Sequence, residues 1–221
     1  MIEARPRRHA RERVDDRFAA VILAGGASSR MGRPKAWLEV AGVPLLRRIV
    51  DHAREVAPRV VVVGAPGQDL PALPDDVVRL DDPPDRVHEG PLSGLSVALE
   101  VLRTSADLAY VGSCDAPFTT PDHIRFVLQT LHDGPFAAVV PETGPDANGR
   151  RILHGLSGAV RVPEAFRTAQ ALLASGRLAL HHLYEALPCR RLALHELPDA
   201  RAIRDCNSPE DWQRALAELE S

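Results

Sequence analysis

Short apolar runs alternate with helical patterns along most of this chain, and that alternation restricts the fold more than any other feature. The runs are FAAVILA (18–24), RVVVVG (59–64), VVRLD (77–81) and DLAYVGS (107–113). The first two are apolar at nearly every position, which is typical of strands that are buried on both faces. A sheet of that kind is usually parallel and covered by helices. The pattern therefore predicts an α/β fold with a mostly parallel central sheet.

Helical patterns connect these runs, over residues 43–56 and 92–103 and again after Thr120. Thr120 is a good N-cap residue, Pro121 suits the first helical position, and Asp122 places an acid in the first turn. Three consecutive start signals predict that a helix begins here.

The later part of the chain is less regular. Residues 136–141 and 154–160 are interpreted as strands around a turn-rich segment at 144–150, and residues 163–176 as a helix ended by a glycine. The last helix should begin at Ser208, with the same capping chemistry as the earlier one. We expect these pieces to extend the sheet and to form a lid or a second substrate lobe.

Length and charge set limits on domain count and function. The 221 residues are enough for one large domain, which we assign to 18–221. Residues 1–17 contain six arginines and four acids and are predicted to be a disordered basic tail. A formal net charge of −3 argues against general nucleic-acid binding.

Cellular location is predicted from two further features. The chain lacks an apolar stretch long enough to span a membrane or to act as a signal peptide. Its three cysteines lack the spacing of a zinc site and do not suggest a disulfide framework. We therefore expect a cytoplasmic protein without a membrane partner.

A glycine-rich loop follows the first predicted strand and ends at Lys35, which is the only lysine of the chain. Gly25 and Gly26 let backbone N–H groups approach an anion closely, and Arg30 and Lys35 supply positive charge, as does Arg33. The loop has neither the GxxxxGK[ST] order of a P-loop nor the GxGxxG order of a dinucleotide site. Nucleotide phosphates are the ligand that it favours, with a flexible basic turn as the alternative.

Asp115 follows the run 107–113, at the predicted carboxyl end of a parallel strand. Such a carboxylate would face the glycine-rich loop, and magnesium in proteins favours one or two carboxylates together with phosphate oxygens. Asp115 is therefore a candidate Mg²⁺ ligand, although Asp-Ala-Pro is also a plausible turn.

A second glycine-containing segment, Gly90-Pro91-Leu92-Ser93-Gly94, begins a predicted helix. Its glycines permit the close approach of a flat ligand, and the first helical N–H groups have no partner within the helix. A nucleotide contact through these residues is predicted, with a simple packing turn as the alternative. Asp81 and Asp82 end the preceding strand and could accept hydrogen bonds from a base or sugar, or form a solvated turn.

The sequence offers no convincing nucleophile. His181 and His182 lie in LALHHLYEAL, where a helical face accounts for them, and motifs such as HExxH and GxSxG do not occur. Cys114 precedes Asp115, whose charge disfavours a thiolate, so that a buried filler is the better interpretation.

These motifs together resemble the molybdenum cofactor guanylyltransferases, the MobA-type branch of the nucleotidyltransferases. The resemblance covers about residues 18–219 and depends on the order and spacing of four segments. They are LAGG-x3-RMG-x2-K (23–35), EGPLSGL (89–95), CDAP (114–117) and NSPED (207–211). It implies a Rossmann-like three-layer sandwich of the nucleotide-diphospho-sugar transferase type. It also implies transfer of GMP from GTP to molybdopterin, with Mg²⁺ as cofactor and pyrophosphate as product.

The resemblance also implies roles for individual residues. Lys35 corresponds to the phosphate-binding lysine, Asp115 to the magnesium ligand, and Asp82 to a nucleotide-contacting aspartate, with Asp81 still possible. Arg30 would face the triphosphate, and Asn207 would lie near the pterin. The loop expected to contact guanine and ribose is Leu23, Ala24, Gly25 and Gly26.

Three positions depart from the family pattern. Gly64 replaces an asparagine that often follows the second strand, His154-Gly155 replaces His-Pro, and Ser208 replaces a threonine. The pair Gly25-Gly26 resembles enzymes that use GTP, whereas relatives that use CTP tend to have LAAG.

Two alternatives stay open. The nearest is another nucleotidyltransferase of this superfamily, a cytidylyltransferase that acts on molybdopterin or on an alcohol phosphate. The other, kept open by Gly64 and Gly155, is a GTP-binding assembly factor without catalysis. A nicotinamide oxidoreductase is disfavoured because GxGxxG is missing. The resemblance further suggests molybdoenzymes or cofactor-insertion proteins as partners.

Overall fold

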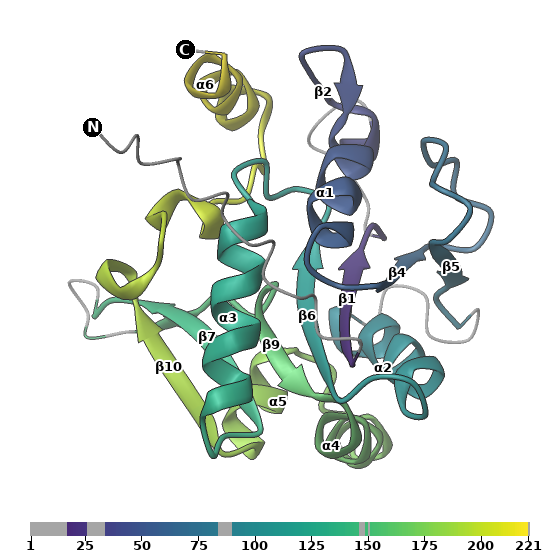
Figure 1. Cartoon of the computed structure of the whole chain (residues 1–221), viewed down its shortest axis with the longest axis vertical. Helices are drawn as coiled ribbons and strands as arrows, with labels where there is room; N and C mark the ends of the chain where they lie inside the picture. The colour runs from purple at the N-terminus through teal and green to yellow at the C-terminus, as the bar shows by residue number, and fades with distance from the viewer. Residues whose placement is uncertain (1–16, 26–33, 84–89, 146–148, 150, 221) are drawn as a thin grey trace, which may run out of the picture.

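A sheet of eight strands forms the centre of the computed structural model (Figure 1), which describes residues 17–25, 34–83, 90–145, 149 and 151–220. The order across the sheet is β10-β7-β9-β6-β1-β4-β5, and β8 pairs with β7. The strands are β1 (Phe18–Leu23), β4 (Arg59–Gly64), β5 (Val78–Asp81), β6 (Leu108–Ser113), β7 (Ala138–Thr143), β8 (Ile152–Leu153), β9 (Ser157–Arg161) and β10 (Cys189–Ala193). A separate small hairpin joins β2 (Glu39–Val40) to β3 (Val43–Pro44).

Helices cover both faces of this sheet. One apolar cluster packs α1, α3 and α6 against the sheet, and a second packs α2, α4 and α5 against the opposite side. The helices are α1 (Leu45–Arg54), α2 (Pro91–Leu102), α3 (Pro121–Asp133), α4 (Val162–Ala174), α5 (His181–Ala186) and α6 (Pro209–Leu219), with short 3-10 turns η1 (Lys35–Trp37), η2 (Leu194–Glu196) and η3 (Ala200–Ile203). This arrangement confirms the predicted three-layer α/β sandwich.

The central strands run parallel and end together. β1 pairs in parallel with β4 on one side and β6 on the other, so that Leu23 lies opposite both Val63 and Ser113. Every side chain of β1 and β6 is buried. The loops after these strands therefore share one edge of the sheet, which is where ligands bind in open α/β sheets.

The predicted strands and helices all form, with shifts of a few residues at their ends. Thr120 caps α3 by accepting a hydrogen bond from the backbone of His123, as its sequence context predicts. β9 starts at Ser157, three residues after the predicted start, and runs antiparallel to β6 and β7. The sheet is thus mostly rather than wholly parallel, as predicted.

Two parts of the prediction cannot be compared with the structure. The basic tail lies, apart from Arg17, outside the described residues, and so does part of the turn at 144–150. Among the described residues, no helix is long and apolar enough to cross a membrane.

His123 on α3 is completely buried and reaches across to β9. Its Nε2 lies 2.8 Å from Ser157 Oγ and 3.2 Å from the Ser157 carbonyl oxygen, while its Nδ1 has no hydrogen-bond partner among the described residues. The carbonyl can only accept, so Nε2 carries the proton and Nδ1 is the site of further protonation. Burial lowers the pKa of His123 below its ordinary value.

This burial predicts a loss of stability in acid. The folded pKa is lower than the unfolded value of about 6.5, so the stability is fully present above that value and decreases as the pH falls below it. The slope should reach about 1.4 kcal/mol per pH unit. We expect His123→Gln to lose less stability than the wild type between pH 7 and pH 5 in urea unfolding. His195→Gln, at an exposed position, is the control, and equal slopes in all three proteins would contradict the prediction.

Candidate active site

The glycine-rich loop begins where β1 ends, and hydrogen bonds to the next strand fix its first residues. Ala24 N donates to Val63 O at 2.7 Å, and Gln68 Nε2 donates to Ala24 O at 3.0 Å. Gln68 Oε1 in turn accepts from Ala65 N at 2.8 Å. One amide side chain therefore connects the loop after β1 to the loop after β4.

Gly64 makes room for this connection. A Cβ built on Gly64 would lie 3.2 Å from Gln68 Oε1 and 3.3 Å from Leu70 Cδ1, which is tight for ordinary contacts. Gly64, where the resemblance leads us to expect asparagine, thus leaves room for the side chain of Gln68. The Gln68 amide lies beside the loop. Nothing in the sequence singled out Gln68, which stands alone among proline, glycine and acidic residues.

Asp82, rather than Asp81, points toward the predicted nucleotide loops. Its backbone N donates to Gly64 O at 2.8 Å. A Cβ built on Gly25 would lie 3.2 Å from Asp82 Oδ2, and one built on Gly94 only 2.6 Å from Asp82 Oδ1. Asp81 is exposed and lies 3.7 Å from Arg79. The structure therefore brings Gly25, Asp82 and Gly94 together.

The segment that starts α2 offers backbone rather than side chains to a ligand. Gly90 has a φ of +99° at the N-cap, and Pro91 takes the first helical position. The side chain of Leu92 is completely buried in the core, and Leu23 is nearly so. Any contact that Leu92 or Leu23 makes with a ligand would use main-chain atoms.

Gly26, Arg30 and Arg33 lie outside the described residues. Their predicted contacts with the nucleotide stay predictions.

Lys35 lies at the meeting point of three chain segments. Its Nζ donates to Asp115 Oδ2 at 2.7 Å and to Asn207 Oδ1 at 2.7 Å. Asp115 follows β6 and Asn207 precedes α6, so that residues far apart in the sequence converge on one ammonium group. The side chains of Lys35 and Asp115 are only 16% and 20% exposed. This convergence of three predicted site residues is the main geometric finding at this edge of the sheet.

Hydrogen bonds hold both oxygen-bearing residues in place. Ser113 Oγ donates to Asp115 Oδ1 at 2.5 Å, and Cys206 N donates to Asp115 O at 2.9 Å. Asp211 accepts from the backbone N of Asn207 at 3.2 Å and of Ser208 at 3.0 Å, and these contacts lower the pKa of Asp211. Ser208 thus keeps the capping role expected at its position, despite the departure from threonine.

Burial and the nearby Asp115 carboxylate raise the pKa of two neighbours, Cys114 and Asp205. Burial raises the pKa of the Cys114 thiol to about 12, and the Asp115 carboxylate adds to the effect, which fits the predicted filler role. Asp205 is an exposed residue, but surrounding protein atoms remove part of its hydration and Asp115 repels its charge. Its pKa is raised to about 6 as a result.

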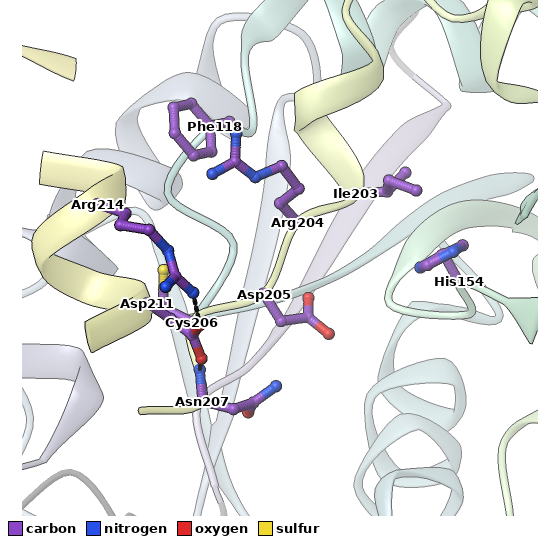
Figure 2. A pocket seen from close by; sticks show the side chains of 9 residues that line it. All are labelled: Phe118, His154, Ile203, Arg204, Asp205, Cys206, Asn207, Asp211 and Arg214. Atoms are coloured by element: carbon purple, nitrogen blue, oxygen red, sulfur yellow. Dashed lines mark hydrogen bonds and ion pairs between the residues drawn. The ribbon is translucent and has the colours of Figure 1, made fainter. Parts of the chain in front are cut away.

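A pocket of about 330 Å³ adjoins Asn207 (Figure 2). Phe118 forms part of its wall and lies beneath the guanidinium groups of Arg204 and Arg201, at 4.7 and 5.2 Å from the ring centroid. Both arginines that line the pocket form ion pairs, Arg204 with Glu218 at 2.9 Å and Arg214 with Asp211 at 2.6 Å. The lining residues are Phe118, His154, Ile203, Arg204, Asp205, Cys206, Asn207, Asp211 and Arg214.

His154 faces this pocket from the hairpin that follows β7 (Figure 2). Its Nε2 lies 3.0 Å from Thr143 Oγ1, and burial lowers its pKa, which favours the neutral imidazole. The sequence marked this residue only as part of a departure, not as a site residue. Packing explains the glycine at position 155, because a Cβ there would lie only 2.9 Å from the ring of Tyr184.

A family model described as the MobA-like NTP transferase domain matches residues 20–201. The chain belongs to this family. The match includes most of β1 together with Lys35, Asp82 and Asp115, while Asn207 lies just beyond its end. The predicted resemblance and the predicted nucleotidyltransferase class are therefore confirmed.

Individual relatives agree with this assignment. A protein of Mycobacterium tuberculosis strain H37Rv named probable molybdenum cofactor guanylyltransferase is 32% identical over 197 residues, which are 86% of this chain and 89% of that protein. A protein of the same name from Mycobacterium avium strain 104 is 29% identical over 91% of this chain and 95% of its own length.

Two solved structures show the MobA-like fold in other proteins. Molybdopterin-guanine dinucleotide biosynthesis protein A from Archaeoglobus fulgidus has a TM-score of 0.70 at 17% identity, covering 92% of this chain and 98% of that one. The 2-C-methyl-D-erythritol 4-phosphate cytidylyltransferase from Thermus thermophilus has a TM-score of 0.69 at 21% identity, covering 91% and 98%. Because the two scores are nearly equal, the fold alone does not separate a guanylyltransferase from a cytidylyltransferase.

The contact between Asp82 and Gly94 predicts coupling between the two positions in a double-mutant cycle. Gly94→Ala should destabilise the protein by about 1–3 kcal/mol, because the new methyl group meets the Asp82 carboxylate and, less closely, Val63 Cγ1. In an Asp82→Ala background the same change should destabilise less, since only the contact with Val63, 3.2 Å from the built Cβ, remains and alanine favours the helix. Urea unfolding of the four proteins measures this difference. Equal effects in both backgrounds would show that Asp82 is not where the structure places it.

Proposed function

We propose that this chain transfers GMP from GTP to molybdopterin and releases pyrophosphate. The observation that carries the proposal is the convergence of Lys35, Asp115 and Asn207 at the end of the central strands. The guanylyltransferase names of relatives that span most of the chain support the choice of substrates.

The oxygens around Lys35 suit a hard divalent cation. Asp115 Oδ2 and Asn207 Oδ1 already lie 2.7 Å from one positive group, and carboxylate and amide oxygens are ligands that Mg²⁺ accepts alongside phosphate and water. In this proposal Asp115 and Asn207 would hold Mg²⁺, which would neutralise phosphate charge when bound. Lys35 would then exchange these oxygens for those of the triphosphate.

The nucleotide would lie across the ends of β1, β4 and β5. Backbone groups of Ala24 and Gly25 would contact base and ribose, held in position by Gln68. Asp82 would accept hydrogen bonds from the base or the sugar, because its carboxylate lies beside both glycine segments. The free backbone N–H groups at the start of α2 would donate further hydrogen bonds to the nucleotide.

The second substrate would occupy the pocket beside Asn207. Its volume of about 330 Å³ and its mixed polar and apolar lining suit a flat heterocycle with several hydrogen-bonding groups. Asp205 and His154 would offer such groups from two sides (Figure 2). The pocket adjoins the Lys35 group, so a phosphate attached to that heterocycle would reach the nucleotide.

The reaction needs alignment and charge neutralisation more than a strong base. An oxygen of the terminal phosphate of molybdopterin attacks the α-phosphorus of GTP in line, and the bond from that phosphorus to the oxygen bridging to the β-phosphate breaks. The electron pair leaves with pyrophosphate, and no bond to the protein forms. Lys35 and the backbone amides of the loop stabilise the charge that develops on the leaving group.

Removing the charge of Lys35 or of Asp115 should slow turnover, and the loss should be larger for Asp115. Lys35→Met should lower kcat by about 10- to 100-fold, since a charge-assisted contact contributes about 1.5–3 kcal/mol. Asp115→Asn should cost more, because it removes the carboxylate that would hold the metal. Pyrophosphate release from GTP and molybdopterin measures both, with Asp133→Asn on the surface of α3 as the control. Activity near wild type in Asp115→Asn would remove the basis of the proposal.

Nucleotide preference can be measured without molybdopterin. At one hundred times its dissociation constant a ligand stabilises the folded state by about 2.7 kcal/mol, which a thermal shift detects. We expect the largest shift with GTP plus Mg²⁺ and smaller shifts with CTP, ATP and UTP. A largest shift with CTP would point instead to a cytidylyltransferase. A GTP shift without pyrophosphate release on adding molybdopterin would point to a binding protein that lacks catalysis.

A further inference from the structure

A group of metal-binding side chains lies on α5, away from the proposed catalytic residues. His181, His182 and Glu185 each offer one ligand atom, and these atoms lie within 4.8 Å of one another. Within the part of the chain that the structure describes, this is the one such group of three histidine, cysteine or acidic residues. From the sequence, a helical face alone accounts for the two histidines.

The helix presents these three residues on one side. Positions 181, 182 and 185 span an arc of about 100° on a helical wheel, with Glu185 between the two histidines. Leu183 and Tyr184 point the other way and are buried in the core between α4 and β7. On the outward face, His181 and Glu185 are exposed and His182 is half-buried.

Both imidazoles are suited to coordinate a metal. Their ring centroids are 4.2 Å apart, and Nδ1 of His182 is buried without a hydrogen-bond partner among the described residues. Two adjacent imidazoles are a donor set that zinc, cobalt and nickel ions accept.

One existing contact competes for Glu185. Arg177 lies 3.9 Å from its carboxylate, and the two side chains are 50% and 49% exposed. An ion pair of this length at the surface is weak. A divalent ion that also gains two imidazole ligands would displace it.

We propose that His181, His182 and Glu185 bind a divalent transition-metal ion of the zinc, cobalt or nickel class. Two imidazoles and one carboxylate favour these ions over Mg²⁺, which prefers oxygen ligands. Ligands at about 2.0–2.1 Å from zinc lie about 3.3 Å apart, so rotation of the exposed His181 and Glu185 side chains closes the group around the ion. Water completes the coordination.

Metal binding would stabilise a segment that supports both proposed substrate sites. A helix of six residues is marginal by itself, and an ion that joins residues 181 and 185 crosslinks one helical turn. Tyr184 Oη on the same helix donates to Gly155 O at 2.7 Å, next to His154 of the pocket. In the loop before α5, Leu178 O lies 3.2 Å from the Cβ position of Gly90, at the start of α2. The site thus has a structural role.

The test uses the full chain, freed of metal by a chelator and without nucleotide. Zn²⁺ is titrated by calorimetry and Co²⁺ by its visible absorption, with excess Mg²⁺ present. We expect one tightly bound ion in the wild type and at least tenfold weaker binding in His181→Ala and in Glu185→Gln. Both changes lie at exposed positions and should leave the fold intact, which circular dichroism checks. His195→Ala, on η2, is the matched control and should bind as the wild type does.

Two outcomes would overturn the proposal. One is the absence of a saturable Zn²⁺ or Co²⁺ signal in the wild type, and the other is wild-type affinity in either His181→Ala or Glu185→Gln. The result does not depend on the proposed guanylyltransferase activity, because no substrate is present in the titration.

Discussion

The contact of Lys35 with Asp115 and Asn207 is the interaction on which the rest of the site depends. It joins the end of the glycine-rich loop, the end of β6 and the start of α6. Two partly buried charges are tolerated because each has hydrogen-bond partners besides the other, from Ser113 and from Asn207. In the proposed function, a divalent ion would take the two oxygens that hold this ammonium, and the ammonium would turn to the triphosphate.

The sequence predicted the central fold because the inner strands carry a strong signal. β1 and β6 are buried on both faces and are apolar at nearly every position, whereas only Leu192 of β10 is fully buried and Arg190 and Arg191 are exposed. An edge strand of this kind has no apolar run to recognise, and neither β8 nor the β2–β3 hairpin exceeds two residues per strand. The strands missed by sequence analysis are those in which tertiary pairing, not hydrophobic pattern, decides the conformation.

Candidate site residues could be predicted from the sequence where they belong to a motif. Those that take part only through one or two hydrogen bonds could not. Lys35, Asp115 and Asn207 belong to spaced motifs after strands or before a helix, and Asp82 follows a predicted strand with Asp81 as the alternative. The topology of a parallel sheet brings the positions that follow its strands to one edge. Gln68 and His154 take part through one or two hydrogen bonds each, with Ala24, Ala65 and Thr143. Single contacts of this kind, made within or between loops, follow no periodic pattern, so the sequence alone gives no reason to select these residues.

The departures from the family pattern have local explanations in packing. At Gly64 the missing side chain leaves space for Gln68, and at Gly155 it leaves space for Tyr184, whose hydroxyl then bonds the glycine carbonyl. Each glycine therefore accompanies a larger neighbour that takes over the vacated volume. Since Gln68 lies beside the nucleotide loop and Tyr184 beneath the pocket hairpin, the two substitutions change the support of each proposed subsite without removing the Lys35 group between them. Loss of pterin binding is thus not implied by Gly155, because the space that a larger residue would fill is already occupied from α5.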